Sequence, residues 1–263
     1  MTRLLSGFAL AVVSAGIIAW GSPGAFRVFI SVFVAVGLYE FFKMLKSAGE
    51  PAIPAVGIAG GVALYYAVSM GGATGALSFT PLIFIIVMGW ATLFHHDNSY
   101  KAASNTLFGL FYIGLTLAPL ALIREMRDGV SLMFLLAFAN TLCDSMAYYT
   151  GKAFGKTPLA PSISPNKTVE GFVGGLAGAV LGAAVFSEFF MPGFGLHHAV
   201  IVGFIAGLAG PVGDLAESST KRKMGVKDSG SFLPGHGGAL DRMDSWMFTA
   251  PLFYVYLRFV AGA

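Results

Sequence analysis

The sequence predicts an all-α polytopic integral membrane protein with about nine transmembrane helices. Of its 263 residues, 56% are hydrophobic and only 11% are charged, whereas a soluble domain usually carries about 25% charged residues. Such a chain cannot cover its own surface with polar groups, so we expect lipid to cover it. The 35 glycines point the same way, because glycine lets membrane helices approach one another closely.

Apolar runs of spanning length divide the sequence into nine candidate helices, since a spanning helix needs roughly 20 such residues. The first run resembles a signal peptide, but the rest of the chain is equally apolar, so we interpret it as an uncleaved span. Only the connections 151–168 and 218–244 are long. We interpret the chain as one continuous membrane domain, with N-terminal transmembrane helices over 1–123 and a C-terminal catalytic region over 124–263. The expected spans are about 4–20, 26–45, 53–70, 80–95, 104–123, 130–150, 169–191, 198–217 and 245–261.

The basic residues predict the orientation of these spans. With the N-terminus inside, twelve basic residues fall on the inner side and four on the outer side, which obeys the positive-inside rule. The C-terminus is then outside, and both long connections face the cytoplasm. Short loops are typical of a bacterial protein, so we expect the bacterial cytoplasmic (inner) membrane. The outer four residues are Arg27, Arg124, Arg127 and Arg258.

Composition also narrows the class of function. The net charge of only +3 indicates no strong field for nucleic acid, so no nucleic-acid partner is expected. The single cysteine, Cys143, excludes an internal disulfide framework and a cysteine-rich zinc site.

The seventh span follows a polar turn and is rich in glycine. Thr168 and Glu170 are expected to help start this helix. Several of the glycines lie four residues apart, a spacing that builds a smooth face for a neighbouring helix. Because they lie inside an apolar helix, we do not interpret them as a phosphate-binding loop. They are Gly171, Gly174, Gly175, Gly178 and Gly182.

Acidic residues concentrate near the C-terminus, where five of the thirteen in the chain fall within 31 residues. Charges near a membrane are functional-site candidates by default. Asp214 and Glu217 are three residues apart, as are Asp241 and Asp244, so each pair shares a helix face. Two such faces could form an oxygen-rich cage for magnesium, with Asp144 in the sixth span as a further candidate. The alternative is a belt of ion pairs with the basic residues nearby.

The same segment carries five basic residues and a glycine-rich stretch. Lys221, Arg222 and Lys227 beside flexible glycine backbone suit a polyphosphate. A basic run beside a membrane also binds anionic lipid headgroups, but that function needs neither the acids nor the glycines. The connection 151–168 adds Lys152, Lys167 and several hydroxyl groups on the same side.

Other polar residues carry less weight. His95, His96 and Asp97 are adjacent and therefore cannot face one metal on a helix, so we expect an interfacial turn. Glu40 lies near a span end, where partial solvation is expected.

Four stretches together are similar to a known signature. The longest comprises Ser218-Ser219-Thr220-Lys221-Arg222, then Lys227-Asp228, then Leu233-Pro234-Gly235-His236-Gly237-Gly238, and finally Asp241-Arg242-Met243-Asp244. Gly213–Ser218, Cys143–Gly151 and Ser164–Gly171 also fit. This pattern resembles the phosphatidate cytidylyltransferase family, also called CDP-diacylglycerol synthases, over roughly the C-terminal half. Thr220 and Ala239 replace larger apolar residues, and Asn166 replaces a lysine common in the family, which removes one phosphate contact.

The resemblance implies that CTP and phosphatidate react to give CDP-diacylglycerol and pyrophosphate, with magnesium as cofactor and a second cation left open. Membrane lipid surrounds such an enzyme, and a homodimer is left open. The resemblance assigns the metal to Asp144, Asp214, Asp241 and Asp244. It implies catalytic roles for Asp214, Asp241, Asp244, Lys221 and Arg222. It implies substrate binding by Ser164, Lys167, Lys227, Asp228, His236, Gly237 and Gly238.

Two other functions stay open at this point. One is a related CTP-dependent lipid enzyme, either a polyprenol-type kinase or an ether-lipid cytidylyltransferase. The other is an ion-coupled transporter, which would spread its charges along a midplane pathway, often in repeated halves. Here the charges gather at one predicted membrane face, and no internal repeat is visible.

Overall fold

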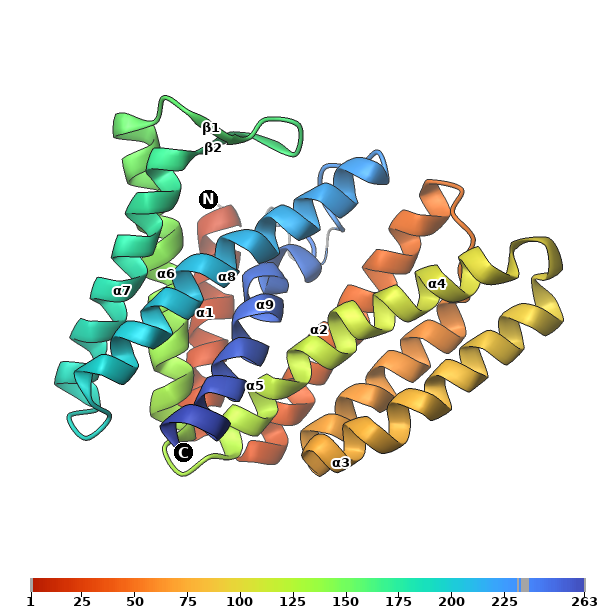
Figure 1. Ribbon diagram of the computed structural model, residues 1–263, viewed down its shortest axis with the longest axis horizontal. Coiled ribbons are helices and arrows are strands. Elements are labelled where there is room, and N and C mark those ends of the chain that lie inside the picture. Colours follow the sequence, from red (N-terminus) through yellow and green to blue (C-terminus); the bar gives the residue numbers. More distant parts are fainter. Residues whose placement is uncertain (1, 231, 233–236, 263) are drawn as a thin grey trace. The chain divides into compact units, whose positions relative to one another are not determined.

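The structure is a computed structural model that describes residues 2–230, 232 and 237–262 (Figure 1). Its contacts divide the chain into two compact units. The first contains residues 1–122 and 221–243, and the second contains 123–220 and 244–263. The described residues are overwhelmingly helical, which confirms the predicted all-α class.

In the first unit, a short connection after the first helix sets the start of the second helix. Ser22 caps this helix, because its Oγ accepts a hydrogen bond of 3.1 Å from the Ala25 N–H, and Pro23 occupies the first turn. The three-residue 3-10 turn His96–Asn98 falls where a turn was expected. The helices of this unit are α1 (Thr2–Trp20), α2 (Pro23–Ser47), α3 (Pro54–Phe94), α4 (Ser99–Gly109), a π-helical stretch (Leu110–Leu115) and α5 (Thr116–Glu125), which runs into the second unit.

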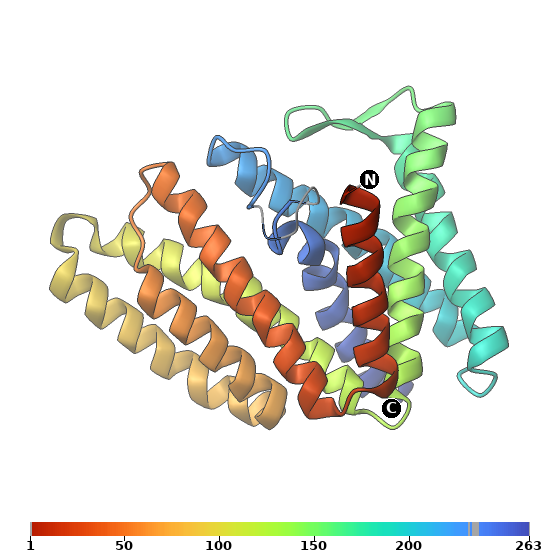
Figure 2. The ribbon, with the colours of Figure 1, turned by 180° about the vertical axis from the view of Figure 1, so that it is seen from behind.

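Helix α3 is a pair of helical legs joined at one residue. Gly72 has φ 55° and ψ −133°, a backbone conformation that breaks the helix and that glycine adopts without a steric penalty. The chain reverses there, and the two legs lie side by side in both ribbon views (Figures 1 and 2). Gly75 returns so close to Ala67 that an added Cβ would lie 1.9 Å from the Ala67 carbonyl oxygen. The predicted spans 53–70 and 80–95 correspond to these two legs.

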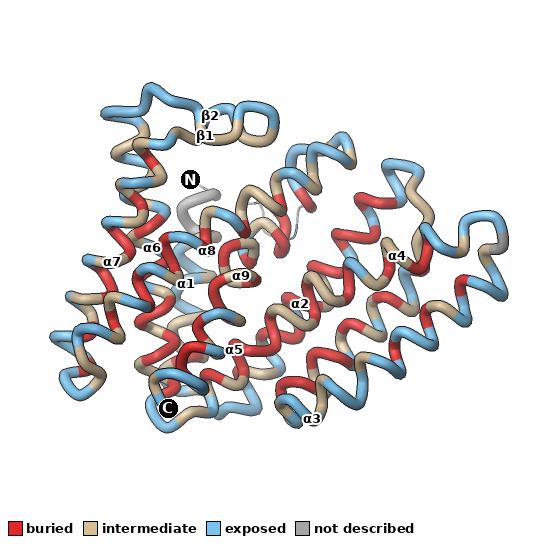
Figure 3. The backbone as a smooth tube through the Cα atoms, in the orientation of Figure 1, coloured by how far each residue is buried: buried red, intermediate tan, exposed pale blue. Residues whose placement is uncertain are grey.

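The core of the first unit lies where α2, the first leg of α3 and the π-helical stretch meet. Leu38, Leu64 and Leu110 are fully buried there. Gly61 and Gly114 bring two backbones into contact, since a Cβ on Gly114 would lie 2.5 Å from the Gly61 carbonyl oxygen. Figure 3 shows that buried positions are frequent along α2, whereas much of α3 is exposed.

The second unit contains two complete long helices and the greater part of two others. An Asn140–Thr249 hydrogen bond of 3.2 Å joins two of them in the interior, α6 and α9. A small residue also allows close packing, because a Cβ on Gly203 would lie 2.4 Å from the Val180 Cα. The helices are α6 (Gly129–Phe154), α7 (Val169–Phe190), α8 (Leu196–Lys223), α9 (Leu240–Tyr256) and a π-helical end (Leu257–Ala261); α8 ends and α9 begins within the first unit.

The glycine-rich face of α7 packs against α6, as its spacing predicted. A Cβ on Gly175 would lie 2.9 Å from the Cys143 carbonyl oxygen, and one on Gly178 would lie 2.6 Å from the Met146 Cγ. These two helices are in extensive contact with each other. The prediction of a smooth helix-packing face is confirmed.

The connection before α7 forms a β-hairpin that the sequence reading did not predict. Strands β1 (Pro158–Ala160) and β2 (Ser164–Thr168) pair in antiparallel fashion. Thr168 caps α7 as expected, because its Oγ accepts from the Gly171 N–H at 3.1 Å. Glu170 instead accepts from the backbone N–H groups of Lys156 and Thr157, at 3.0 and 3.2 Å, and so ties the base of the hairpin to α7.

Among the described residues, six helices are long and apolar enough to cross a membrane. They are α2, α3 counted as one helix, the continuous segment 99–125, α6, α7 and α8. Helix α3 exposes many large apolar side chains, among them Leu77, Ile85 and Leu93, as expected of a surface that lipid covers. The chain is thus a membrane protein, while the predicted number of nine spans stays a prediction.

Candidate active site

The residues predicted to form the site fall in both units, so each group is described within its own unit. In the second unit, Lys167 of β2 meets Asp214 of α8. The Lys167 Nζ lies 2.5 Å from the Asp214 Oδ2, and the Ser218 hydroxyl donates to the Asp214 Oδ1 at 3.3 Å from one turn further along α8. Both charged side chains stay partly accessible, at 27% for Lys167 and 37% for Asp214.

A cavity of about 440 Å³ opens beside this ion pair. Asp144 of α6 lines it together with Lys167 and Asp214, so the structure brings together three residues that the sequence analysis selected from three separate stretches. Ser164, also selected, lies at the start of β2 opposite Ala160 and is not among the lining residues. The remaining lining residues are Ala147, Tyr148, Gly151, Lys152, Leu159, Asn166, Thr168, Gly171, Phe172 and Pro211.

Asp244 of α9 lies next to α8 at the level of Asp214. A Cβ on Gly213 would lie 2.5 Å from the Asp244 carbonyl oxygen, so only glycine lets the two helices approach this closely. Glu217, one turn after Gly213 on α8, is buried, with 1% of its surface exposed. Asp244 is therefore held at the contact of α8 with α9 and Asp214 at the cavity beside it, while Glu217 is buried one turn further along α8.

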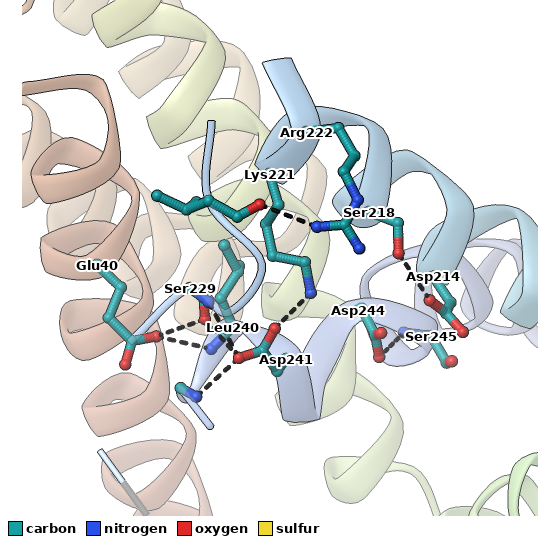
Figure 4. Close-up of polar contacts among 12 residues, drawn as sticks. Glu40, Asp214, Ser218, Lys221, Arg222, Ser229, Leu240, Asp241, Asp244 and Ser245 are labelled. Carbon is teal, nitrogen blue, oxygen red and sulfur yellow. Dashed lines mark hydrogen bonds and ion pairs between the residues drawn. The ribbon is translucent and has the colours of Figure 1, made fainter. Parts of the chain in front are cut away.

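In the first unit, Asp241 forms the centre of a dense polar cluster (Figure 4). Its Oδ1 lies 2.5 Å from the Lys221 Nζ. Its Oδ2 accepts from the Ser229 N–H at 3.2 Å, the Ser229 hydroxyl at 2.9 Å and the Gly238 N–H at 2.7 Å. One carboxylate thus binds a lysine and both described ends of the glycine-rich segment 229–240, at Ser229 and at Gly238.

The glycines of this segment are required by the same contacts. Gly237 has φ 82°, and a Cβ there would lie 2.7 Å from the Asp241 Oδ2. A Cβ on Gly238 would lie 2.1 Å from the Ser229 Oγ. Larger residues would therefore displace Asp241 or Ser229.

The other residues expected in the first unit are more peripheral. The exposed Arg222 donates to the Val226 carbonyl oxygen at 3.1 Å and closes the turn after α8. Lys227 and Asp228 are exposed. His236, like the Leu233–Gly235 part of the motif, lies outside the described residues.

Comparison with known proteins decides the family. The model of the Cytidylyltransferase family matches residues 1–260. The chain belongs to the cytidylyltransferase family. It is accordingly an enzyme of nucleotidyl transfer, as the sequence analysis predicted.

Curated relatives of this cytidylyltransferase-family chain carry a more specific name. A protein of Bacillus subtilis called phosphatidate cytidylyltransferase is 31% identical over 97% of this chain and 96% of its own length. One of the same name from Staphylococcus saprophyticus is 40% identical, over 65% of each chain. Another from Aquifex aeolicus is 38% identical over 67% of this chain and 66% of its own length. The Staphylococcus match thus spans just under two thirds of that relative.

The residues of this cytidylyltransferase-family chain can be tested for their fit to magnesium. No group of three or more metal-binding side chains already close enough for a common ion occurs among the residues described in Figure 1. However, Asp144 and Asp214 line one cavity together with Asn166, and carboxylate and amide oxygens are ligands that magnesium prefers. The donor chemistry of this cavity fits the ion. The alternative interpretation as ion pairs also describes Asp214 and Asp241, each of which meets a lysine.

The sequence analysis did not select one acidic residue of this family member as a site residue. Glu40, expected to be partly solvated, is buried, with 3% of its surface exposed, and it contacts the glycine-rich segment. The signal that could have identified it is its position between the apolar residues Leu38, Tyr39, Phe41 and Phe42. An ionisable residue inside an apolar span is by default a functional candidate.

Proposed function

We propose that this protein is a phosphatidate cytidylyltransferase, which converts CTP and phosphatidate into CDP-diacylglycerol and pyrophosphate. The observation that carries the proposal is the alignment with the Bacillus subtilis phosphatidate cytidylyltransferase over 97% of this chain and 96% of the relative. The six apolar helices suit a lipid substrate. The lysines paired with carboxylates in both units suit a reaction between phosphates.

The reaction is a displacement at the α-phosphorus of CTP. An oxygen of the phosphatidate phosphate forms a new bond to that phosphorus, and the bond to the oxygen bridging to the β-phosphate breaks, so that pyrophosphate leaves with the electron pair. The nucleophile is already an anion, so no strong base is required. The barrier is electrostatic, because one anion must approach another and further charge develops on the leaving group.

Lysine side chains held by carboxylates suit this task. Lys167 and Lys221 each lie 2.5 Å from an aspartate oxygen, and the ion pair orients each lysine. A preorganised positive group stabilises developing negative charge without having to reorganise during the reaction. We assign both lysines to phosphate groups of the substrates, with Arg222 and Lys227 as further phosphate-binding residues from the exposed part of the segment.

Magnesium would be held by carboxylates of the acidic clusters, and when bound it would screen phosphate charge and polarise the α-phosphate. We assign Asp144 and Asp214 to it first, because both line the cavity that also contains Asn166. Asp241 and Asp244 complete the proposed set. In the described structure Asp241 holds Lys221 and three hydrogen-bond donors, so its part in metal binding would require some of these contacts to loosen.

The proposed location is the cytoplasmic face of a bacterial inner membrane. The positive-inside count favours this side for the N-terminus and both long connections. CTP is a cytosolic solute, whereas phosphatidate lies in the leaflet, so a site at this face has access to both substrates.

The test is an assay of the purified full-length protein in mixed micelles. We expect CTP, phosphatidate and magnesium together to give equal amounts of pyrophosphate and CDP-diacylglycerol. A lipid panel with diacylglycerol, a polyprenol and an ether-lipid phosphate, and a nucleotide panel with ATP, GTP and UTP, establish selectivity. Release of CDP instead of pyrophosphate would indicate a kinase and would refute the proposal, as would ion flux through liposomes that needs no CTP in a protein inactive toward phosphatidate.

A further inference from the structure

One face of α2 contacts Ser229, Phe232 and Leu240, described residues of the signature region in the first unit. Phe33, Gly37 and Glu40 are spaced at i, i+4 and i+7, so they share a face of the helix. Phe33 meets Phe232 edge to face, with ring centroids 6.2 Å apart. A Cβ on Gly37 would lie 3.9 Å from the Leu240 Cδ1. The N-terminal half of the chain, which carries no part of the signature, therefore contacts the signature segment.

Glu40 makes the polar contact on this face. Its Oε2 accepts from the Ser229 hydroxyl at 3.2 Å and from the Leu240 N–H at 3.0 Å (Figure 4). Leu240 is the first residue of α9, and the first N–H groups of a helix have no partner within the helix. A carboxylate at this end is also favoured by the helix dipole. Glu40 therefore fixes the start of the helix that carries Asp241 and Asp244.

Two glycines close against the same carboxylate. A Cβ on Gly230 would lie 2.2 Å from the Glu40 Oε1, and one on Gly238 would lie 2.4 Å from the Glu40 Oε2. Glu40 thus sits between the two described ends of the segment, one at Ser229 and Gly230 and the other at Gly238 and Leu240. Without this carboxylate, the Leu240 N–H would lose its acceptor and the two ends would lose their common anchor.

The chemistry of Glu40 argues against a role in packing alone. Burying a carboxylate costs free energy even when hydrogen bonds partly compensate. An apolar residue would fill the same volume in an apolar helix at lower cost. The carboxylate is matched to what it contacts, a hydroxyl and the N–H groups near a helix start.

We propose that Gly237, Gly238 and the Lys221–Asp241 pair belong to the nucleotide site and that Glu40 is its positioning residue: by holding Ser229 and Leu240, at the start of α9, it keeps the Lys221–Asp241 pair in the geometry that binds CTP. Its effect passes through Ser229, whose hydroxyl lies 3.2 Å from Glu40 Oε2 and 2.9 Å from Asp241 Oδ2 and shares its single proton between them, and through Leu240, the neighbour of Asp241. This inference rests on the proposed function, because CTP is its ligand. It adds a residue from outside the signature to that site.

The first test separates the two substrates. We expect Glu40→Ala to raise the KM for CTP about tenfold or more while the KM for phosphatidate changes less than twofold. Glu40→Gln keeps the shape and one acceptor oxygen and should fall between Glu40→Ala and the unchanged protein. The matched control is Glu50→Gln, an identical substitution in the same unit at a carboxylate whose partner is Lys101, at 2.7 Å; it should change neither constant by more than twofold. Equal increases in both KM values, or a fall in kcat with both KM values unchanged, would overturn the proposal.

The second test asks whether the contact itself is responsible. Gly230→Ala should raise the KM for CTP severalfold, because its Cβ would meet Glu40. In a Glu40→Ala background, where that space is open, the same substitution should raise the KM for CTP by less than a further twofold. A Gly230→Ala penalty of the same size in both backgrounds would overturn the proposal.

The same double-variant comparison made on thermal unfolding needs no substrate. If the unchanged protein released no pyrophosphate from CTP and phosphatidate, the proposed function would fail. In that case, non-additive changes in the unfolding midpoint of the Glu40 and Gly230 variants would still establish the contact through which Glu40 holds the segment. Additive midpoints together with a normal wild-type reaction would instead remove the anchor and leave the proposed function standing.

Discussion

The Lys167 Nζ lies 2.5 Å from the Asp214 Oδ2 and thereby joins a hairpin strand to α8 within the second unit. The two residues are 47 positions apart in the sequence, and the stretches that carry them were each selected for a different reason, one as a polar helix-start connection and the other as an acidic helix end. Because both residues line the 440 Å³ cavity, substituting either of them tests the proposed site directly.

Loss of the Lys167 charge should impair catalysis strongly. We expect Lys167→Met to lower kcat/KM by about 100-fold, the usual scale for removing one group that stabilises developing charge. Lys156→Met is the matched control, because it removes the same charge from an exposed position of the same connection and should cost less than about threefold. Comparable losses in the two variants would show that only the overall charge of the connection matters.

Asp241 and Lys221 should behave as one functional unit. We expect Asp241→Asn and Lys221→Met each to reduce pyrophosphate release by about 100-fold. The double variant should be only slightly less active than the less active single variant, since the effects of substituting two residues in direct contact do not add. Full activity of Asp241→Asn would contradict both its assigned role and that of its lysine partner.

Removal of divalent cations should abolish the reaction, and magnesium should restore it. Asp144 lines the cavity with Asp214, so we expect Asp144→Asn to raise the magnesium concentration for half-maximal activity by about tenfold or more. Asp97→Asn, in the 3-10 turn before α4, provides the control and should leave that concentration unchanged. An unaltered magnesium requirement in Asp144→Asn would remove this residue from the metal set.

The α6–α7 contact should tolerate no added side chain. A Cβ on Gly178 would lie 2.6 Å from the Met146 Cγ and 2.9 Å from the Leu142 carbonyl oxygen. We expect Gly178→Ala to destabilise the protein by about 1–3 kcal/mol, measured as a lower Tm in detergent. Gly89→Ala is the control, because nothing lies within 4 Å of its added Cβ; a drop in Tm as large as that of Gly178→Ala would refute the packing explanation.

Local patterns predicted those features whose cause is also local. The spacing of glycines in α7 indicated a packing face because i and i+4 residues share one side of any helix, and Thr168 indicated a helix start because its hydroxyl reaches an N–H three residues on. The acidic pairs on α8 and α9 could be selected for a similar reason, since charge is rare in this chain. The composition and the lengths of the apolar runs were sufficient for the all-α membrane class.

Features that depend on distant partners could not be predicted in this way. Glu40 lies 189 and 200 positions before Ser229 and Leu240, so its apolar neighbours could mark it as a candidate but could not show which residues it contacts. The β1–β2 hairpin is held at its base by Glu170 through backbone groups of Lys156 and Thr157, which any residue would supply. Its strands also contain Pro158 and Pro165, residues that are unfavourable in strands.

The reversal at Gly72 has a consequence for how the chain threads through the bilayer. The segment 51–94 contains no Asp, Glu, Lys or Arg, so neither leg carries a charge that would favour one side over the other. Because the second leg runs back along the first, the two ends of α3 lie on the same side of the bilayer. The pair of legs therefore adds an even number of crossings. The sidedness of every later helix is therefore the same whether the turn reaches the far surface or stops within the lipid.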